Sequence, residues 1–349
     1  MTVEKEKAFG KASSFRVISN LLTAEEEVGA DGFLSLQAGV VAIGNFDGVH
    51  RGHRVVLDTA RRLAEQNGGP MPAVAMTFEP HPRTVFNPAA PVFRLTPPGV
   101  KARLFDALDL DGMAIVPFDR DFSQMRAESF VTELLVARLR VAHVVVGYDF
   151  HFGKGREGSS EFLIGMGKRH GFGVSVVPAQ KNANGDLVFS SSATRDCLRE
   201  GDAAGAAAIL GYRYFVTGTV IHGEKRGRDL GYPTANMALA PDNGLCHGIY
   251  AVRARVDGAV IPGVASYGRR PTFDNGAPLL ETFLFDFSGD LYGKAIEIVF
   301  VKYLRGEAKF DSLEALIVQM DADSREARLV LEQAGEGTKL DAALDARAI

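Results

Sequence analysis

Between residues 39 and 212, short apolar runs alternate with longer segments in which apolar residues recur at helical spacing. The runs are VVAIGNF, PAVAMTF, GMAIVPF, AHVVVG and FGVSVVP, and segments such as HRVVLDTARRLAEQ separate them. Continuous Val, Ile and Ala runs separated by helices are typical of a parallel sheet covered on both faces. Ligands of such sheets bind beyond the carboxyl ends of the strands. The pattern therefore predicts an α/β domain over residues 15–212 with its site at that edge.

The pattern changes after about residue 213. The segments YFVTGTVIHG, GIYAVRARV, AVIPGVASYG, LLETFLFDF and KAIEIVFVKYL are strand-like, and Gly, Asp, Asn and Pro separate them. Dense strands without intervening helices indicate an antiparallel barrel or sandwich. The helical segment DSLEALIVQMDADSREARLVLEQ follows. We expect a second domain over residues 213–335 and a mobile polar tail over 334–349.

Length, charge and cysteine content narrow the class of protein. A chain of 349 residues, 46% of them hydrophobic, suits two domains with sizeable cores. The formal net charge of -4 argues against a nucleic-acid partner, and no apolar run reaches membrane-spanning length or resembles a secretory signal. Two cysteines, Cys197 and Cys246, cannot form a disulfide scaffold or a zinc cage. We expect a cytoplasmic monomer or weak homo-oligomer that binds neither nucleic acid nor membrane.

The turn GNFDGVHRGH, residues 44–53, follows the first strand of this pattern and leads into the first helix. A helix N-terminus offers unpaired N–H groups and the positive end of its dipole, which favour phosphate. Gly48 and Gly52 let the backbone approach such a ligand, and His50 and His53 add donors without a permanent charge. Alternatively the histidines cap the helix, whereas a zinc site lacks a Cys or Glu at ligand spacing. We favour the phosphate site.

A second motif, FSSSATR (189–195), places three hydroxyl groups and an arginine at a helix start. These groups can hold β- and γ-phosphates and stabilise departing pyrophosphate. Taken alone, the motif is better explained as a serine N-cap.

The segment GKGREG (153–158) formally matches the G-x-G-x-x-G pattern of dinucleotide-binding proteins. Such a fingerprint turns directly from strand to helix, with an acidic residue about 20 positions later. Here YDFHF intervenes after the strand and Asp186 stands too late. We interpret the segment as a mobile substrate loop.

A third motif, GEKRGRDLGYPTAN (223–236), combines glycines with Lys225, Arg226 and Arg228 in a basic arch able to cover phosphates. The stiff turn after it presents the Thr234 hydroxyl and the Asn236 amide. Mg²⁺ prefers oxygen ligands, so one threonine with nucleotide phosphates makes a sensible site. A solvated Gly/Asn/Pro turn explains the bare sequence equally well.

GNFDGVHRGH is similar to the H-x-G-H signature of the nucleotidylyltransferases, and its flanking residues resemble the bacterial bifunctional riboflavin kinase/FMN adenylyltransferase (FAD synthetase) family. Four further segments resemble that family in the same order: TFEPHP (77–82), VVGYDFHFGKGREGS (145–159), FSSSATR and GRDLGYPTAN (227–236). The resemblance covers residues 15–330. It implies a Rossmann-like nucleotidylyltransferase domain with a parallel sheet, then an antiparallel β-barrel riboflavin kinase domain with a C-terminal helix.

For the first domain, the resemblance implies catalytic roles for His50, His53 and Arg195, and flavin contacts by Asp149 and Phe150. The residues implied to bind ATP are Gly44, Asn45, Phe46, Asp47, Gly48, Gly52, Ser190, Ser191 and Ser192. The chain departs from the family where Ala193 replaces an arginine of many relatives and Ser192 replaces a threonine. Because Arg195 keeps its position, this departure bears on turnover rate and not on reaction type.

For the second domain, the resemblance implies that Glu281 accepts the proton of the ribityl 5'-hydroxyl and that Arg305 and Phe310 lie near the flavin. It implies that Thr234 and Asn236 contact Mg²⁺. The residues implied to bind ATP are Gly223, Lys225, Gly227, Arg228, Gly231, Pro233 and Asn236.

The resemblance thus implies an enzyme that phosphorylates riboflavin to FMN and then adenylylates FMN to FAD. Its ligands would be ATP with Mg²⁺, riboflavin, FMN and FAD, the flavins being substrates and products. Three alternatives stay open: one half is active and the other is a flavin-binding scaffold, the chain is a non-catalytic flavin sensor, or it is a cytidylyltransferase.

Overall fold

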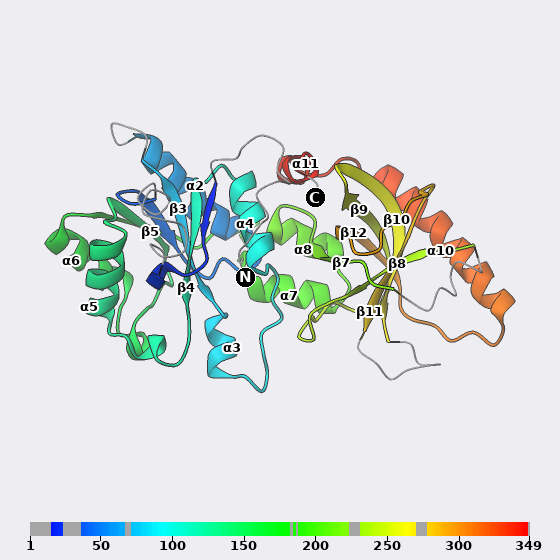
Figure 1. Ribbon diagram of the computed structural model, residues 1–349, viewed down its shortest axis with the longest axis horizontal. Helices are drawn as coiled ribbons and strands as arrows, with labels where there is room; N and C mark the ends of the chain where they lie inside the picture. Colours follow the sequence, from blue (N-terminus) through cyan, green and yellow to red (C-terminus); the bar gives the residue numbers. More distant parts are fainter. Residues whose placement is uncertain are drawn as a thin grey trace. The chain divides into compact units, whose positions relative to one another are not determined.

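The computed structural model describes residues 15–23, 36–66, 71–181, 184–185, 188–222, 231–269 and 278–347 (Figure 1). The chain divides into two compact units, and the division falls between Ser191 and Ser192. On this division the helices α7 (Ser191–Arg199) and α8 (Ala203–Leu210) belong almost wholly to the second unit. The limits 15–212 and 213–335 stay predictions.

The first unit contains the predicted parallel sheet. Its six strands lie in the order β1-β4-β3-β2-β5-β6, and every neighbouring pair is parallel. After β2 the chain builds outward through β3 and β4, and it then returns to the other side of β2 with β5 and β6. The strand order therefore reverses between β2 and β5, where open α/β sheets bind their ligands. The strands are β1 (Arg16–Ile18), β2 (Val40–Ile43), β3 (Ala73–Glu79), β4 (Gly112–Pro117), β5 (His143–Gly147) and β6 (Gly173–Val177).

Helices cover this sheet as the sequence pattern predicts. Alternate side chains of a strand point to opposite faces, so that Val41 and Ile43 join the core of one face while Val40 and Ala42 face the other way. The helix α2 (Arg51–Gln66) packs on β2 and β5. The other helical segments of the unit are α3 (Pro82–Phe86), α4 (Pro98–Ala107), α5 (Ala127–Ser129), α6 (Ser160–His170), the π-helix η3 (Phe130–Arg138) and the short 3-10 turns η1 (Leu21–Thr23), η2 (Phe122–Gln124) and η4 (Lys154–Arg156).

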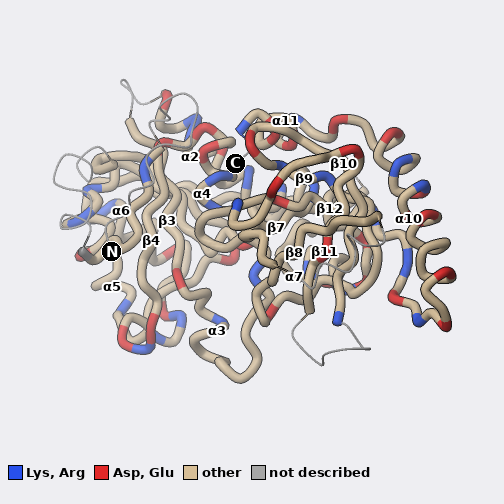
Figure 2. The backbone as a smooth tube through the Cα atoms, turned by 45° about the vertical axis from the view of Figure 1, so that its right-hand side comes forward, with Lys and Arg blue, Asp and Glu red and all other residues tan. Residues whose placement is uncertain are grey.

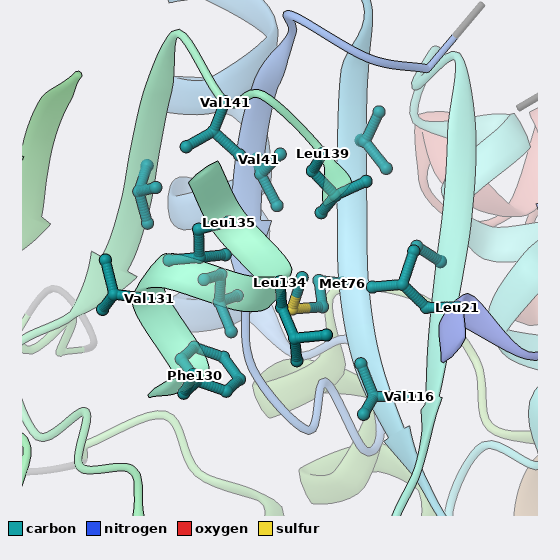
Figure 3. Packing of buried hydrophobic residues seen from close by; sticks show 14 of the residues in the cluster. Leu21, Val41, Met76, Val116, Phe130, Val131, Leu134, Leu135, Leu139 and Val141 are labelled. Atoms are coloured by element: carbon teal, nitrogen blue, oxygen red, sulfur yellow. The ribbon is translucent and has the colours of Figure 1, made fainter. Parts of the chain in front are cut away.

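The core of the first unit lies between η3 and the sheet (Figure 3). Figure 3 shows Leu134 of η3 beside Met76 of β3, and Phe130 and Leu135 of η3 belong to the same cluster as Met76 and Val41 of β2. All five side chains are buried. Since each contributes about 1.5–3 kcal/mol when it leaves water, this cluster fixes the central strands that present the site.

The second unit is an antiparallel sheet with the strand order β7-β12-β9-β10-β11-β8. The two edge strands meet where the Ile221 N–H donates to the Asn236 carbonyl oxygen at 2.9 Å, so the sheet nearly closes into a barrel. Of the two predicted architectures, barrel and sandwich, the barrel is confirmed. The strands are β7 (Phe215–Thr219), β8 (Thr234–Ala238), β9 (Gly248–Val256), β10 (Ala259–Gly268), β11 (Leu279–Leu284) and β12 (Ala295–Arg305).

The predicted closing helix is α10 (Leu313–Gln333), which packs on β9, β10 and β12. Ala327 and Leu331 are buried against the barrel. Acidic and basic residues are interspersed along the rest of the helix (Figure 2), as expected of a face turned to water.

The expectation of a mobile tail after residue 334 is wrong for the described residues. They form a further helix, α11 (Lys339–Asp345), which starts with a capping box between Thr338 and Asp341. Leu340 and Leu344 are buried. The capping box and the two leucines at i and i+4 are local signals, but they stand in a segment too short and too polar to predict a docked helix from composition.

Candidate active sites of the two units

The GNFDGVHRGH turn lies at the carboxyl end of β2, at the point where the strand order reverses. The predicted position between a strand and a helix is confirmed. The turn needs an unusual backbone: φ is positive at Phe46 (47°), Gly48 (84°) and Val49 (40°). Phe46 and Val49 are buried, and residues in this region persist only where the surroundings hold them. Gly52 is required for a different reason, because a Cβ there would lie 3.1 Å from the His50 ring.

Asp47 ties the turn to the segment that precedes α4. Its carboxylate is buried and accepts hydrogen bonds from the backbone N–H groups of Leu95 (3.0 Å) and Thr96 (2.9 Å). The Gly48 N–H in turn donates to Thr96 Oγ1 at 2.8 Å. These bonds explain why an aspartate stands here. The ATP contact implied for Asp47 stays a prediction.

The two histidines lie against each other at the start of α2. Their rings stack with centroids 3.6 Å apart and planes inclined by 20°. His50 Nδ1 accepts from the His53 backbone N–H at 3.3 Å, so His50 does cap the helix. Capping and phosphate binding are compatible, because a neutral ring whose Nδ1 accepts carries its proton on Nε2.

His53 is kept neutral by its surroundings. Burial lowers its pKa well below the ordinary value, and the charges of His50 and then Lys101 act in the same direction. Within the described part of the chain, His53 Nδ1 is buried and has no hydrogen-bond partner. A neutral imidazole at a helix N-terminus can donate a hydrogen bond to a phosphate without holding it as a permanent cation would.

Behind the turn lies a buried lysine that the sequence analysis missed. Lys101, on α4, is 2% exposed and donates to the Asn45 carbonyl oxygen (3.0 Å), Thr77 Oγ1 (2.9 Å) and Glu79 Oε1 (2.9 Å). Burial lowers the pKa of this lysine, against the opposing effect of Glu79. A signal was present, since Lys101 stands next to Val100 and three residues before Leu104, on the apolar side of its helix.

A group of phenylalanine rings follows the carboxyl ends of β3, β4 and β5. Phe118 contacts both Phe78 and Phe86, with centroids 6.1 and 5.8 Å apart, and Phe150 stacks on Phe152 at 5.2 Å. Phe86 is 63% exposed, which is unusual for so large an apolar side chain. Sequence reasoning found only Phe150 in this group. Asp149, exposed, stands beside it after β5, the strand that pairs with β2.

The GKGREG segment does not turn from a strand into a helix. It contains the short 3-10 turn η4 and is closed by an antiparallel bridge between Phe152 and Gly158. The rejection of a dinucleotide fingerprint is therefore confirmed.

The serine-rich motif reaches the GNFDGVHRGH turn. Ser191 Oγ donates to the Asp47 carbonyl oxygen at 2.7 Å, across 144 positions of sequence. α7 begins at Ser191, as the motif predicts. Arg195 is a buried residue of this helix, whereas Ser190 is half-buried and Ser192 is exposed. Their contacts with ATP stay predictions.

In the second unit, the register of two strands brings separate motifs together. Asn236 of β8 lies directly opposite Glu281 of β11, and Thr234 lies opposite Phe283. Since side chains alternate along a strand, Thr234, Asn236 and Glu281 share one face of the sheet. Residues of the other face, such as Leu280, are buried in the barrel. This pairing joins positions 45 residues apart and could not be read from the sequence.

Asn236 has the property expected of a ligand. It is 4% exposed, and its Oδ1 is buried with no hydrogen-bond partner among the described residues. Gly231, with φ of 84°, lies in the turn just before β8. The hydroxyl of Tyr232, the residue after Gly231, donates a hydrogen bond to Asp321 of α10. Burial and then this carboxylate raise the pKa of Tyr232 to about 12. Gly223, Lys225, Gly227 and Arg228 lie outside the described residues.

Of the two residues expected near the flavin of the second unit, Arg305 is the last residue of β12 and Phe310 lies between β12 and α10. Arg305 forms a two-pronged ion pair with Asp323 of α10, at 2.8 and 2.6 Å. Its guanidinium therefore fastens α10 to the barrel. Phe310 is half-buried in the segment before α10. The flavin contacts of Arg305 and Phe310 stay predictions.

The described residues contain neither a metal-binding cluster of acidic, His and Cys side chains nor a helix that could span a membrane. No group of three or more His, Cys, Asp or Glu side chains could hold a metal ion there. Nor does any described helix have the length and apolar character needed to cross a membrane.

Two family models match the chain, and most of α8 lies between the two matched ranges. A model described as FAD synthetase matches residues 34–193, and one described as riboflavin kinase matches residues 210–331. The chain is similar to the bifunctional riboflavin kinase/FMN adenylyltransferase of Escherichia coli K12, with 38% identity over 290 residues that cover 83% of this chain and 91% of the relative. The protein of the same name from Bacillus subtilis is 37% identical over 299 residues, covering 82% and 91%.

A solved structure is also similar. The crystal structure of a macrolide-efflux protein from Streptococcus pneumoniae aligns with a TM-score of 0.75 and 27% identity. The alignment covers 90% of this chain and 98% of that one.

Proposed function

The chain belongs to the family of bifunctional riboflavin kinases/FMN adenylyltransferases, and we propose that the turn after β2 carries its adenylyl transfer and the β8–β11 face its kinase reaction. Its function is FAD biosynthesis: it phosphorylates riboflavin with ATP to FMN and adenylylates FMN with ATP to FAD. The single observation that supports the division of labour is that each unit has its own cluster of polar side chains at a position suited to phosphate chemistry.

In adenylyl transfer, a phosphate oxygen of FMN attacks the α-phosphorus of ATP, and the bond to the β-phosphate breaks to release pyrophosphate. No proton needs to be removed from the attacking group, so positioning and charge stabilisation supply the catalysis. His50 and His53 donate hydrogen bonds to the phosphates at the N-terminus of α2. Arg195 and the hydroxyls of Ser190, Ser191 and Ser192 stabilise the leaving pyrophosphate. The bond from Ser191 to Asp47, both in the first unit, supports the placement of Ser191. The roles of Ser192 and Arg195, which belong to the second unit, rest on the family resemblance alone.

The phenylalanine group supplies a surface for the flavin ring of FMN in the first unit. An exposed Phe86 and a half-buried Phe150 offer aromatic faces close to the edge where β2 and β5 end. Planar aromatic ligands stack on such faces. Asp149 adds a carboxylate beside Phe150.

In the kinase reaction, the ribityl 5'-hydroxyl oxygen attacks the γ-phosphorus of ATP and ADP leaves. Glu281 accepts the hydroxyl proton, since a carboxylate within hydrogen-bond reach suits this task. Thr234 and Asn236 share its face of the sheet, and Asn236 Oδ1 has no hydrogen-bond partner within the described ranges, so the oxygens present fit Mg²⁺ bound with ATP phosphates. When bound, Mg²⁺ neutralises phosphate charge. We assign ATP binding in this unit to the glycines and basic residues of segment 223–228, together with Gly231 and Pro233.

Single variants assayed for each product separately test this assignment. His53→Ala should abolish FAD formation from FMN and leave FMN formation from riboflavin unchanged. Thr234→Ala should do the reverse. Each variant is incubated with ATP, Mg²⁺ and either flavin, and the products are separated. Loss of both products from one substitution would contradict two separate sites.

The alternative in which one half is only a flavin-binding scaffold rests on Ala193 and predicts that wild-type protein supplied with FMN makes no FAD. The cytoplasmic location and the monomeric or weakly oligomeric state stay predictions.

A further inference from the structure

A buried cation lies directly behind the histidine turn and belongs to none of the motifs. Lys101 comes from α4, whereas the groups it bonds come from the turn and from β3. Burying an ammonium group costs desolvation free energy, so a lysine is seldom fully buried unless other contacts offset that cost. The contacts of Lys101 therefore indicate which part of the structure it stabilises.

We propose that Lys101 is a positioning residue for adenylyl transfer: its ammonium group fixes the Asn45 carbonyl and thereby the shape of the turn that presents His50 and His53. The inference rests on the proposed role of these histidines. Lys101 itself touches neither ATP nor FMN in this account.

The Asn45 carbonyl is held from two sides. Lys101 Nζ donates to it at 3.0 Å, and Thr77 Oγ1 donates at 3.1 Å. Lys101 also bonds Thr77 Oγ1, so the three groups form a closed triangle. Positive φ values begin at the next residue, Phe46, and return at Val49. Non-glycine residues keep such a conformation only where several contacts hold it, and the triangle supplies these contacts at the entry of the turn.

The charge of Lys101 also acts on His53. The titratable groups whose charge affects His53 are His50, from the turn, and Lys101, from α4, and both lower its pKa in addition to burial. Lys101 is itself balanced by Glu79, which Arg94 contacts as well. Lys101 therefore contributes to keeping the His53 ring neutral while its hydrogen bonds hold the turn.

A neutral replacement of similar length should leave the fold intact. Lys101→Met removes the ammonium group, but Glu79 keeps Arg94 at 2.6 Å and Asn45 keeps Thr77. Glu79 is then not left without a cation, which is the usual cause of collapse when such a pair is broken. Asp47, the other carboxylate whose charge acts on Lys101, keeps the backbone N–H donors of Leu95 and Thr96.

The test compares Lys101→Met with Lys168→Met, an exposed lysine of α6 in the same unit. For Lys101→Met we expect kcat for FAD formation to fall about 10- to 100-fold, as a small misplacement of reacting groups produces, with KM for ATP changed less than about threefold. FMN formation by the same chain is the internal control and should be unchanged. Lys168→Met should match the wild type. NMR titration of the His53 ring should show a higher pKa in Lys101→Met.

Two further variants keep the result decisive. If Lys101→Met unfolds the first unit, Thr77→Val, which removes one hydroxyl of the triangle, should still lower kcat for FAD formation. If Lys101→Met folds, the double variant with Thr77→Val should lose less than the product of the single losses, because both act on one carbonyl. Wild-type kcat in either single variant would overturn the inference, and the proposed function would stand. Full FAD formation in His53→Ala would instead overturn the proposed function.

Discussion

The two units place phosphate chemistry in different ways. In the first, ten consecutive residues form a turn at the carboxyl end of β2, and a helix N-terminus directs them to one point. In the second, the face is assembled from two strands, with Asn236 and Glu281 brought together by register alone. The difference teaches that a site built on a turn is visible as a motif, whereas a site built on a sheet face is visible only after the strands are paired.

The supports behind the two sites also differ. Lys101 of the first unit bonds the functional turn itself. Arg255, the buried cation of the second unit, lies on β9 and pairs with Glu297 of β12 and Asp345 of α11. The first cation therefore acts on the site, and the second fastens elements of the barrel.

The largest effect is expected at the kinase base. Glu281→Gln keeps the size of the side chain but cannot accept a proton, so kcat for FMN formation should fall about 10²- to 10⁴-fold. FAD formation from FMN should be unchanged. Initial rates with saturating ATP check both. An unaltered kinase rate would remove Glu281 from the β8–β11 site and leave that face without a base.

Arg255→Met should destabilise the second unit alone. The Arg255 side chain is 1% exposed and its partner Glu297 is 0% exposed, and breaking such a buried pair costs about 3–5 kcal/mol. Denaturant unfolding should show an earlier transition, with loss of kinase activity before adenylyl transfer. The control Lys294→Met breaks an exposed pair with Asp257 and should leave unfolding unchanged. Equal destabilisation of both units would contradict the separation.

Gly52→Ala tests whether the shape of the turn matters as much as its chemistry. The new Cβ would lie 3.1 Å from the His50 ring, so the stacked pair must shift by a few tenths of an ångström. We expect FAD formation to fall about tenfold, with an unchanged kinase rate. The matched control is Gly165→Ala on α6, where the added methyl meets no atom within 4 Å. A wild-type rate in Gly52→Ala would mean that the stacked geometry is not needed.

The smallest effect is a pH dependence of stability confined to the first unit. The pKa of His53 is lowered in the folded chain by burial and the neighbouring charges, while the unfolded chain keeps a value of about 6.5. As pH falls below about 6.5, the unfolded state takes up a proton that the folded state does not, so stability decreases. This histidine should therefore lower the free energy of unfolding of the first unit as pH falls from 7.5 to 5.5. Urea unfolding should show a larger loss in the wild type than in His53→Gln, in which His143, whose pKa burial also lowers, keeps its own contribution.

Much of the fold could be predicted because its signals are local. Apolar runs such as that around Val41 predicted the parallel strands, and helical spacing predicted α2 and α10. The docking of α11 could not be predicted, because it depends on Arg255 and on buried sites for Leu340 and Leu344 that exist only in the folded barrel.

Some parts of the candidate sites could likewise be predicted from the sequence, and others could not. The histidine turn was recognisable from its glycines and its place after a strand. Lys101 escaped notice although it stands on the apolar side of its helix. The phenylalanine group was missed because Phe86 looks like a core residue until its surroundings are known. For Asn236 and Glu281, the bare sequence held nothing that joined them, since cross-strand register is set by the whole sheet.

The central claim is that one chain carries two independent reactions, and mixing two defective chains tests it most directly. His53→Ala should make FMN but not FAD, and Glu281→Gln should make FAD from FMN but not FMN from riboflavin. Equal amounts of both variants, given riboflavin, ATP and Mg²⁺, should together form FAD after a lag in which FMN accumulates. Formation of FMN without FAD by the mixture, although Glu281→Gln alone converts added FMN, would contradict the account.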